Sequence, residues 1–190
     1  RALDGADLEI QEGERIILLG PSGSGKTTLL NCISALDSPT AGTYTFDGSP
    51  VPRNDSEEMT SFRRKNIGYV FQFFNLLQDL TVIENIMLIQ ELSGSRDENR
   101  ARQLLELVGL SGEVNRFPAE ISGGQQQRVA IARSLAKSPR LLLGDELTGN
   151  LDSKTSAMVM EVLIKACEAE GITCIFVTHD ESLVEYATRA

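Results

Sequence analysis

The residues best suited to chemistry form one glycine-rich segment, residues 20–27, with the sequence GPSGSGKT. It fits the phosphate-binding pattern GxxxxGK(S/T) at every fixed position. Its glycines let the backbone fold so that N–H groups point inward and hold phosphate oxygens. Lys26 can reach the β- and γ-phosphates of a nucleotide, and the Thr27 hydroxyl can bind Mg²⁺. The segment predicts a nucleotide site comprising Gly20, Pro21, Ser22, Gly23, Ser24, Gly25, Lys26, Thr27 and Thr28.

The segments on either side support this interpretation. Arg15–Leu19 is short and apolar, as in a buried strand, and Thr28–Leu36 has the spacing of a helix with Leu29, Ile33 and Leu36 on one face. A loop between a strand and a helix places the positive helix end at the phosphates. The alternative, a flexible Gly/Ser turn, requires neither neighbour.

Two adjacent acids are the next candidates. Asp145 and Glu146 follow the apolar strand Leu141–Leu143, at the sheet edge where we expect the phosphate-binding loop. One acid can hold Mg²⁺ through water while the other orients or deprotonates an attacking water. A solvated turn leading into the bend at residues 148–150 is the alternative.

A second anion site is predicted at a helix start, where Ser122 supplies a hydroxyl and Gly123 and Gly124 supply N–H groups. Ser122 and Gln125 also have capping-box spacing, and both interpretations can hold together. Capping alone does not require two glycines, which lower helix stability.

His179, the only histidine, follows the strand Cys174–Val177; on its own it is more typical of a surface residue.

The composition is that of one intracellular globular domain. The chain has 190 residues, 41% hydrophobic and 24% charged, without a run long enough to cross a bilayer or a signal peptide at its start. A net charge of −9 argues against broad binding to nucleic acid or an anionic membrane. The basic cluster at 63–65 is expected to be a solvated helix end. Cys32, Cys167 and Cys174 form no CxxC pair and are expected to be reduced packing residues.

The elements that position these residues predict an α/β fold with a parallel core. Residues 8–10 and 15–19 are expected to be strands joined by a turn at 12–13, and residues 42–48 another strand, together forming an antiparallel layer. A polar helix near 56–65 precedes a strand at 67–71 that ends at Gln72. Helices follow from the capping boxes Thr81/Glu84, Ser95/Glu98 and Ser122/Gln125, ending at Leu92, Gly109 and about Ala136. A crossover helix at 153–170, stopping at Gly171, then joins the last two strands.

Taken together, these segments resemble the ATP-binding subunit of ABC transporters over nearly the whole chain. The resemblance rests on five motifs in order: the Walker A loop at 20–27, the Q-loop at Gln72, the signature at 122–125, Walker B through Asp145 and Glu146, and the switch residue His179. Residues 71–77 and 148–154 resemble the branch containing lipoprotein-release, macrolide-efflux and cell-division ATPases. Such a P-loop NTPase has a RecA-like core, here 1–72 and 140–190, and an inserted helical lobe, here 73–139.

The resemblance also implies roles for particular residues. Glu146 would be the general base, with Lys26 and His179 as catalytic contacts to the γ-phosphate, and Thr27, Gln72 and Asp145 would serve the Mg²⁺ site. Two copies would close head to tail, so that ATP lies between the Walker A loop of one and Ser122 to Gln125 of the other, with Asp152 in the loop that crosses the interface. Leu147 and Ile121 stand where the family usually has proline and leucine.

The implied function is an ATPase that powers transport through a separate transmembrane permease subunit, at the cytoplasmic side of the membrane. The resemblance implies a single domain trimmed at both ends, without the aromatic residue that stacks on adenine. An ABC-type ATPase acting on DNA or the ribosome would predict coiled-coil insertions, tandem domains or basic surfaces, which the chain lacks. A small-molecule kinase would leave the signature and His179 unexplained.

Overall fold

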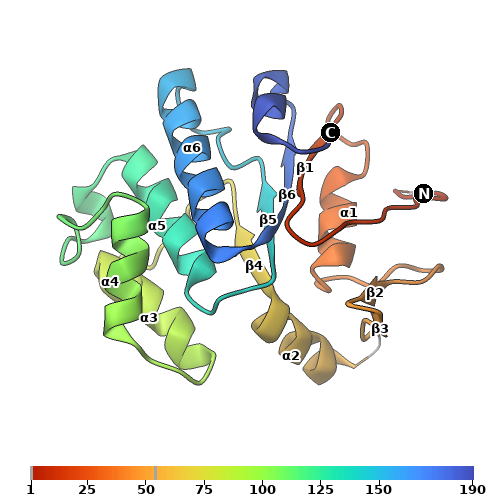
Figure 1. Ribbon diagram of the computed structural model, residues 1–190, viewed down its shortest axis with the longest axis horizontal. Coiled ribbons are helices and arrows are strands. Elements are labelled where there is room, and N and C mark those ends of the chain that lie inside the picture. The colour runs from red at the N-terminus through yellow and green to blue at the C-terminus, as the bar shows by residue number, and fades with distance from the viewer. Residues whose placement is uncertain (1, 54) are drawn as a thin grey trace.

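The core of the protein is a four-stranded parallel sheet, seen at the centre of Figure 1. The computed structural model describes residues 2–53 and 55–190. The strands are β1 (Arg15–Leu19), β4 (Ile67–Val70), β5 (Leu141–Asp145) and β6 (Thr173–Thr178), in the spatial order β1-β6-β5-β4. The predicted parallel core is therefore confirmed. In register, Leu19 pairs with Thr178 and Asp145 with Val177, so the segments after these three strands leave the sheet at one edge.

Helices cover both faces of this sheet, because strand residues alternate between two apolar clusters. Ile16, Leu143 and Ile175 face α1 (Lys26–Ile33) and the aromatic residues near α2 (Ser56–Asn66). Ile17, Leu142 and Cys174 face the opposite cluster, which contains residues of α5 (Gly123–Leu135) and α6 (Ser153–Glu170). The result is a three-layer α/β arrangement in which the loop after each strand is fixed from both sides.

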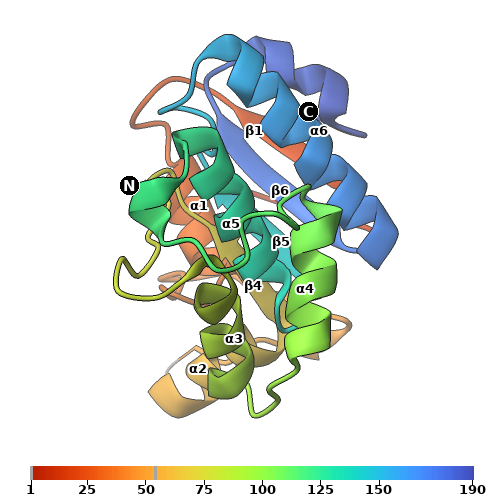
Figure 2. The same ribbon diagram turned by 90° about the vertical axis from the view of Figure 1, so that its left-hand side faces the viewer.

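The chain between β4 and β5 forms a group of helices on one side of the molecule, green in Figures 1 and 2. It contains α3 (Val82–Leu92), α4 (Glu98–Leu107), the short 3₁₀ helix η1 (Pro118–Glu120) and α5. We call residues 73–139 the helical lobe. Buried Ile86, Leu104 and Ile131 come from its three α-helices. They pack in the same apolar cluster as the sheet face that carries Ile17 and Leu142. The lobe is thus attached to the core by shared hydrophobic packing.

The antiparallel part is smaller than the sequence predicts. It consists of β2 (Thr45–Phe46) and β3 (Ser49–Pro50), which form a two-stranded sheet separate from the core. The predicted strand at Leu8–Ile10 is wrong, although the turn at Glu12-Gly13 is present. Residues 8 and 9 are exposed and no strand lies beside them in the described chain, so their alternation of apolar and polar residues has no partner to pair with.

Two helix boundaries also differ from expectation. Helix α1 ends at Ile33, and Ala35 has a left-handed φ of 56°, so Leu36 lies outside the helix and is 53% exposed. Helix α4 is capped by Asp97, whose carboxylate accepts from the backbone N–H of Arg100, and not by Ser95. An ionised cap interacts more favourably with the helix dipole than a hydroxyl does. The 3₁₀ helix η2 (Glu181–Tyr186) follows β6.

Other predicted features agree with the structure. The capping boxes Thr81/Glu84 and Ser122/Gln125 are present, and α6 ends at Gly171 in a left-handed conformation. The basic cluster at 63–65 forms the last turn of α2, where Arg64 and Lys65 are exposed as expected, whereas Arg63 is half-buried and donates to the carbonyl of Ala35. Cys167 and Cys174 are buried, and Cys32 is partly so. None of the described helices has the length and apolar character to cross a bilayer.

Candidate functional site

The glycine-rich segment forms a loop between the end of β1 and the start of α1, as predicted. Gly25 occupies the N-cap position with a left-handed φ of 95°, which glycine adopts without strain. No side chain caps this helix, and none of the residues in its first turn is acidic. The backbone N–H groups and the positive end of α1 are therefore available to an anion, as phosphate binding requires.

Lys26 folds back across the same loop. Its ammonium group donates to the carbonyl oxygens of Gly20 at 2.6 Å and Pro21 at 2.9 Å, and lies 3.4 Å from the Ser24 hydroxyl. All of these acceptors are neutral, and no ion pair of Lys26 is formed within residues 2–53 and 55–190. The positive charge is thus held over the loop with no carboxylate of the described residues in ion-pair contact, which suits the recognition of phosphate oxygens.

Thr27 and Asp145 meet where α1 begins and β5 ends. The Thr27 hydroxyl donates to Oδ2 of Asp145 at 3.0 Å. Burial raises the pKa of the Asp145 carboxyl, and Glu146 adds to this rise, while the hydrogen bond from Thr27 and the charge of Lys26 oppose it. A partly desolvated carboxylate beside a hydroxyl is a favourable environment for a hard cation. Mg²⁺ takes one or two protein oxygens and completes its octahedron with water and phosphate, so these two side chains fit it.

Glu146 and His179 form the second pair at this edge. Nδ1 of His179 lies 3.3 Å from Oε1 of Glu146, and a protonated Nδ1 donates to that carboxylate. His179 follows β6 and its side chain is 67% exposed, whereas that of Glu146 is 34% exposed. Both residues line a cavity of about 170 Å³ together with Thr148, Ser156 and other polar residues. The pair therefore borders open space that can hold water.

The backbone around Glu146 is held in an unusual conformation. Glu146 has a left-handed φ of 47°, which costs a non-glycine residue free energy. Its N–H donates to the carbonyl of Val177 at 2.9 Å, and its own carbonyl accepts from Gly149 at 3.0 Å. The next residue, Leu147, is buried and packs directly over Gly144. These contacts fix the loop although it has leucine where the related family usually has proline.

Gln72 leaves the end of β4 and lies beside the loop that follows Glu146. The amide of Asn150 donates to the backbone carbonyl of Gln72 at 3.0 Å, and the Gln72 side chain lies close to Gly149. The structure thus brings Gln72 next to the Glu146 loop, as the predicted constellation requires.

The signature segment lies apart from the phosphate-binding loop of its own chain. Within the described residues, no hydrogen bond or ion pair joins Ser122 to Gln125 with residues 20–27, Asp145, Glu146 or His179. Gly124 has a structural role as well, because a Cβ there would lie 2.5 Å from the methyl carbon of Thr155 on α6. At Gly123 the same atom would make ordinary contacts with Phe74 and Leu151. One of the two glycines is therefore explained by packing.

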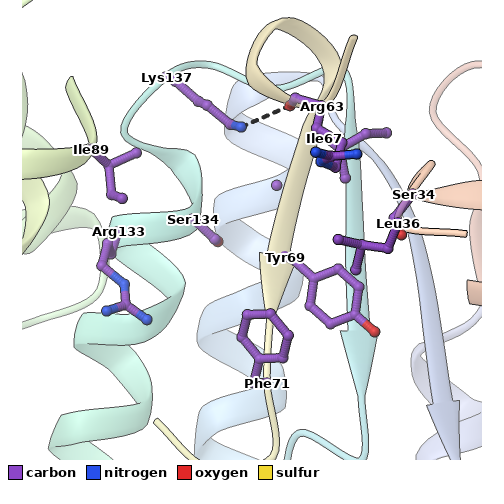
Figure 3. A pocket seen from close by; sticks show the side chains of 11 residues that line it. Ser34, Leu36, Arg63, Ile67, Tyr69, Phe71, Ile89, Arg133, Ser134 and Lys137 are labelled. Carbon is purple, nitrogen blue, oxygen red and sulfur yellow. Dashed lines mark hydrogen bonds between the residues drawn. The ribbon is translucent and has the colours of Figure 1, made fainter. Parts of the chain in front are cut away.

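A groove lies along β4 and Phe71, between the helical lobe and the residues that follow α1 (Figure 3). It encloses about 250 Å³. Tyr69 and Phe71 stack along β4 with their ring centres 4.3 Å apart, and Leu36 faces them. Arg63, Arg133 and Lys137 also line the groove.

The three cations of this groove bind neutral acceptors. Lys137 donates to the carbonyl of Arg63 at 2.8 Å, and Arg133 donates to the carbonyls of Phe74 and Asn75. None of the three forms an ion pair within the part of the chain that the structure describes. Burial, and then the charges of Arg64 and Arg63, lower the pKa of Lys137 to about 8. The groove thus combines apolar surface with unneutralised positive charge in an acidic protein.

Sequence reasoning missed Gln127, Asn150 and the groove cations. Gln127 is fully buried on α5 and its amide donates to the backbone carbonyl of Leu147 at 2.7 Å. The one available signal was its position four residues before buried Ile131, which places a polar side chain on the apolar face of the helix. The groove gave no signal, because its residues are scattered from position 34 to position 137.

Comparison with known proteins supports the same interpretation as the geometry. Residues 3–149 match the family model described as ABC transporter. The chain is 46% identical to an uncharacterized ABC transporter ATP-binding protein of Methanocaldococcus jannaschii, over 99% of this chain and 85% of that one. It is 47% identical to the lipoprotein-releasing system ATP-binding protein LolD of Geobacter metallireducens, over 98% and 84%. It also matches 27% of the macrolide export ATP-binding/permease protein MacB of Syntrophobacter fumaroxidans, at 46% identity.

Solved structures agree with these matches. The ATP-binding cassette MJ0796, a dimer in a post-hydrolysis state bound to ADP and Pi, superposes with a TM-score of 0.85 at 42% identity, covering 98% of this chain and 83% of that one. The protein cbiO1 from Clostridium perfringens, part of the ABC transporter complex cbiONQ, gives a TM-score of 0.88 at 29% identity, covering 98% of this chain and 75% of that one. The chain therefore belongs to the ABC transporter family, as its ATP-binding and ATP-hydrolysing cassette.

Proposed function

We propose that this cassette hydrolyses ATP with Glu146 as the general base and does so between two copies that face each other. The observation that supports the chemistry is the position of Glu146 beside His179 and directly after Asp145, at the sheet edge that also carries the phosphate-binding loop. All four strands of the sheet deliver their following segments there, so the base, the cation site and the phosphate site are brought together by topology.

The phosphate end of the nucleotide is held by the loop and by α1. Backbone N–H groups of residues 20–27 and the helix end bind the phosphate oxygens, and Lys26 exchanges its carbonyl partners for them. Thr27 and Asp145 would hold Mg²⁺ with their side-chain oxygens. When bound, Mg²⁺ neutralises negative charge that develops on the phosphates.

Glu146 takes the proton from the attacking water, and His179 contacts the γ-phosphate. The left-handed backbone of Glu146, fixed through Val177 and Gly149, holds the carboxylate at the rim of the cavity with His179. A fixed base needs no reorganisation at the moment of reaction, which is where much of the catalytic effect of such sites lies.

The second copy supplies the signature. Ser122 and its neighbours make no polar contact with the phosphate-binding loop of their own chain in the described structure, yet they present a helix end with free N–H groups. MJ0796, the similar cassette, is a dimer when bound to ADP and Pi. A head-to-tail pair places Ser122 and Gly124 of one copy at the γ-phosphate bound by the other, so neither copy has a complete site alone.

The membrane partner is a permease subunit, with the cassette at the cytoplasmic face of the membrane. Two of the relatives are a lipoprotein-releasing system ATP-binding protein and an ATP-binding/permease protein. The groove of Figure 3 is the docking site, because its lining includes Phe71, the residue before Gln72, and pairs apolar walls with three unneutralised cations. Its occupant is a cytoplasmic segment of the permease with an acidic residue next to an apolar one.

Replacing Lys137 and Arg63 with Glu should stop recovery of the permease with the cassette and leave the ATPase activity of the cassette alone within about twofold of that of the unaltered chain. Undiminished recovery of the permease would exclude the groove as the docking site.

The first experiment is the molecular mass of the Glu146→Gln variant in solution, with and without Mg-ATP, by light scattering. Loss of the base with retention of the phosphate contacts should stop turnover and trap a dimer that forms only with ATP. Normal hydrolysis by the variant would remove Glu146 from its role. A monomer that binds ATP but never dimerises would remove the two-copy site.

A further inference from the structure

Gln127, on the signature helix, donates a hydrogen bond out of the helical lobe to the catalytic loop. Its side chain is fully buried, and its amide nitrogen donates to the carbonyl of Leu147 at 2.7 Å. The facing atom must be nitrogen, because a carbonyl oxygen only accepts. Oε1 has no hydrogen-bond partner within residues 2–53 and 55–190. A leucine of similar size would fill the same space without a buried amide, so the bond to Leu147 is what a glutamine adds here.

The two preceding glutamines, Gln125 and Gln126, form hydrogen bonds only inside the lobe in the described structure, unlike Gln127. The amide of Gln125 donates to Glu113, and that of Gln126 donates to the carbonyls of Pro118 and Ile121. Both sets of partners lie within the lobe. In the described structure, the Gln127 bond is the only hydrogen bond that joins residues 73–139 to residues 146–152. Only this side chain therefore links the signature helix to the catalytic loop through a hydrogen bond.

The bond acts on the peptide next to the base. Leu147 follows Glu146, whose left-handed backbone is held on its other side by the hydrogen bond to Val177 on β6. We propose that Gln127 is a positioning residue, which couples the position of the signature helix to the position of the Glu146 carboxylate in the same chain. The inference rests on the proposed role of Glu146 as the base. When the signature engages the nucleotide of a second copy and α5 shifts, the carbonyl of Leu147 shifts with it.

The direct test is the steady-state hydrolysis of Mg-ATP by Gln127→Leu. Removal of the hydrogen bond to Leu147 should lower kcat by about 10- to 100-fold, the cost of misplacing a reacting group by a fraction of an ångström to an ångström, and change KM less than about threefold. The matched control is Ile131→Val, one turn further along α5 and also fully buried. This change loosens the packing of the same helix and leaves the Leu147 carbonyl bonded, so its kcat should stay within about twofold of the unaltered chain.

A double-mutant cycle separates positioning from a general loss of activity. In the Glu146→Gln background there is no base to position, so Gln127→Leu should lower the residual hydrolysis no further. The ATP-dependent dimer of Glu146→Gln should also form in the double variant. If Glu146→Gln itself retained turnover, the base assignment would fail. If Glu146→Gln stopped turnover while Gln127→Leu kept it within about twofold, or if the two effects multiplied fully, only the positioning role would fail.

A second variant decides the matter if Gln127→Leu does not fold. In Gln127→Glu the carboxyl group has the shape of the amide but can donate to Leu147 only while protonated, and burial raises its pKa. The ratio of its kcat to that of the unaltered chain should fall as pH rises from about 6 to 9. A ratio close to one and independent of pH would overturn the proposal.

Discussion

The Thr27 hydroxyl donates to Oδ2 of Asp145 across 3.0 Å, although the two residues lie 118 positions apart in the chain. The contact joins the first turn of α1 to the last residue of β5, so one hydrogen bond ties the phosphate-binding loop to the acidic pair. A cation that enters this site meets two oxygens already placed at its edge.

Replacing Thr27 with Val should weaken the binding of the Mg²⁺ that hydrolysis requires, because the shape of the side chain is kept and its oxygen is lost. The Mg²⁺ concentration for half-maximal activity should rise about tenfold or more, as expected for one lost bond to a charged group. Titration of ATPase activity with Mg²⁺ measures this. Thr27→Ser keeps the hydroxyl and serves as the control; an unchanged titration of Thr27→Val would contradict the assigned cation site.

His179→Ala should lower kcat by about 10²- to 10³-fold, the usual effect of removing one donor to a developing charge. The binding of ATP, measured by equilibrium titration, should change little. Because the side chain of His179 is 67% exposed, the free energy of unfolding should move by no more than about 0.5 kcal/mol. Glu181→Gln, two residues further on, is the control. Turnover near that of the unaltered chain would show that His179 is only a surface residue.

Gly124→Ala should destabilise the fold by about 1–3 kcal/mol, because the added Cβ meets the methyl carbon of Thr155 at 2.5 Å. Thr155→Ser removes that methyl group and keeps the hydroxyl that donates to Asp152, so the double variant should recover most of the loss. Gly123→Ala, where the new atom finds ordinary contacts, is the matched control. Urea unfolding of the four proteins tests the clash. Equal stability of Gly124→Ala and Gly123→Ala would disprove it.

Lys137 should make stability depend on pH above neutrality. Its pKa of about 8 in the folded chain lies below the value of a solvated lysine, chiefly because of burial and then because of Arg64 and Arg63. Between these two pKa values the unfolded chain binds the extra proton, so this group increases the free energy of unfolding as pH rises through that window. Lys137→Met removes the effect. The stability of this variant relative to the unaltered chain should therefore decline from pH 7 to pH 10, and a difference independent of pH would contradict the shifted pKa.

The sequence predicted the fold wherever a local signal coincided with the packing. The P-loop pattern, the apolar runs at 15–19 and 141–143 and the glycine at 171 placed the parallel core and α6 within a few residues. Predictions were wrong where a segment had no neighbouring strand to pair with, or where a nearby residue had a stronger structural preference than the one expected. Leu8–Ile10 has no adjacent strand among the described residues, Asp97 and not Ser95 caps α4, and Leu36 follows a left-handed Ala35 that ends α1.

The site was predicted through its motifs, and its supporting contacts were not. Positions of Lys26, Asp145, Glu146 and His179 follow from strand ends, which the sequence shows directly. The bond from Gln127 to a carbonyl 20 residues away depends on how α5 lies against β4 and α6, and no single-sequence signal reports a backbone acceptor. Assignments of ATP contacts to residues 122–125 and of Gln72 to the cation site stay predictions.

Helix α5 carries the signature at its first turn, Gln127 in its second and Arg133 near its last, where Arg133 lines the groove. Its 13 residues make a rod of about 20 Å. A hydrogen-bonded rod of that length does not shorten or bend appreciably under the forces of protein contacts. A movement of α5 caused by an occupant of the groove or by a second copy would therefore reach the carbonyl of Leu147 at the same moment, and not through a chain of separate local changes.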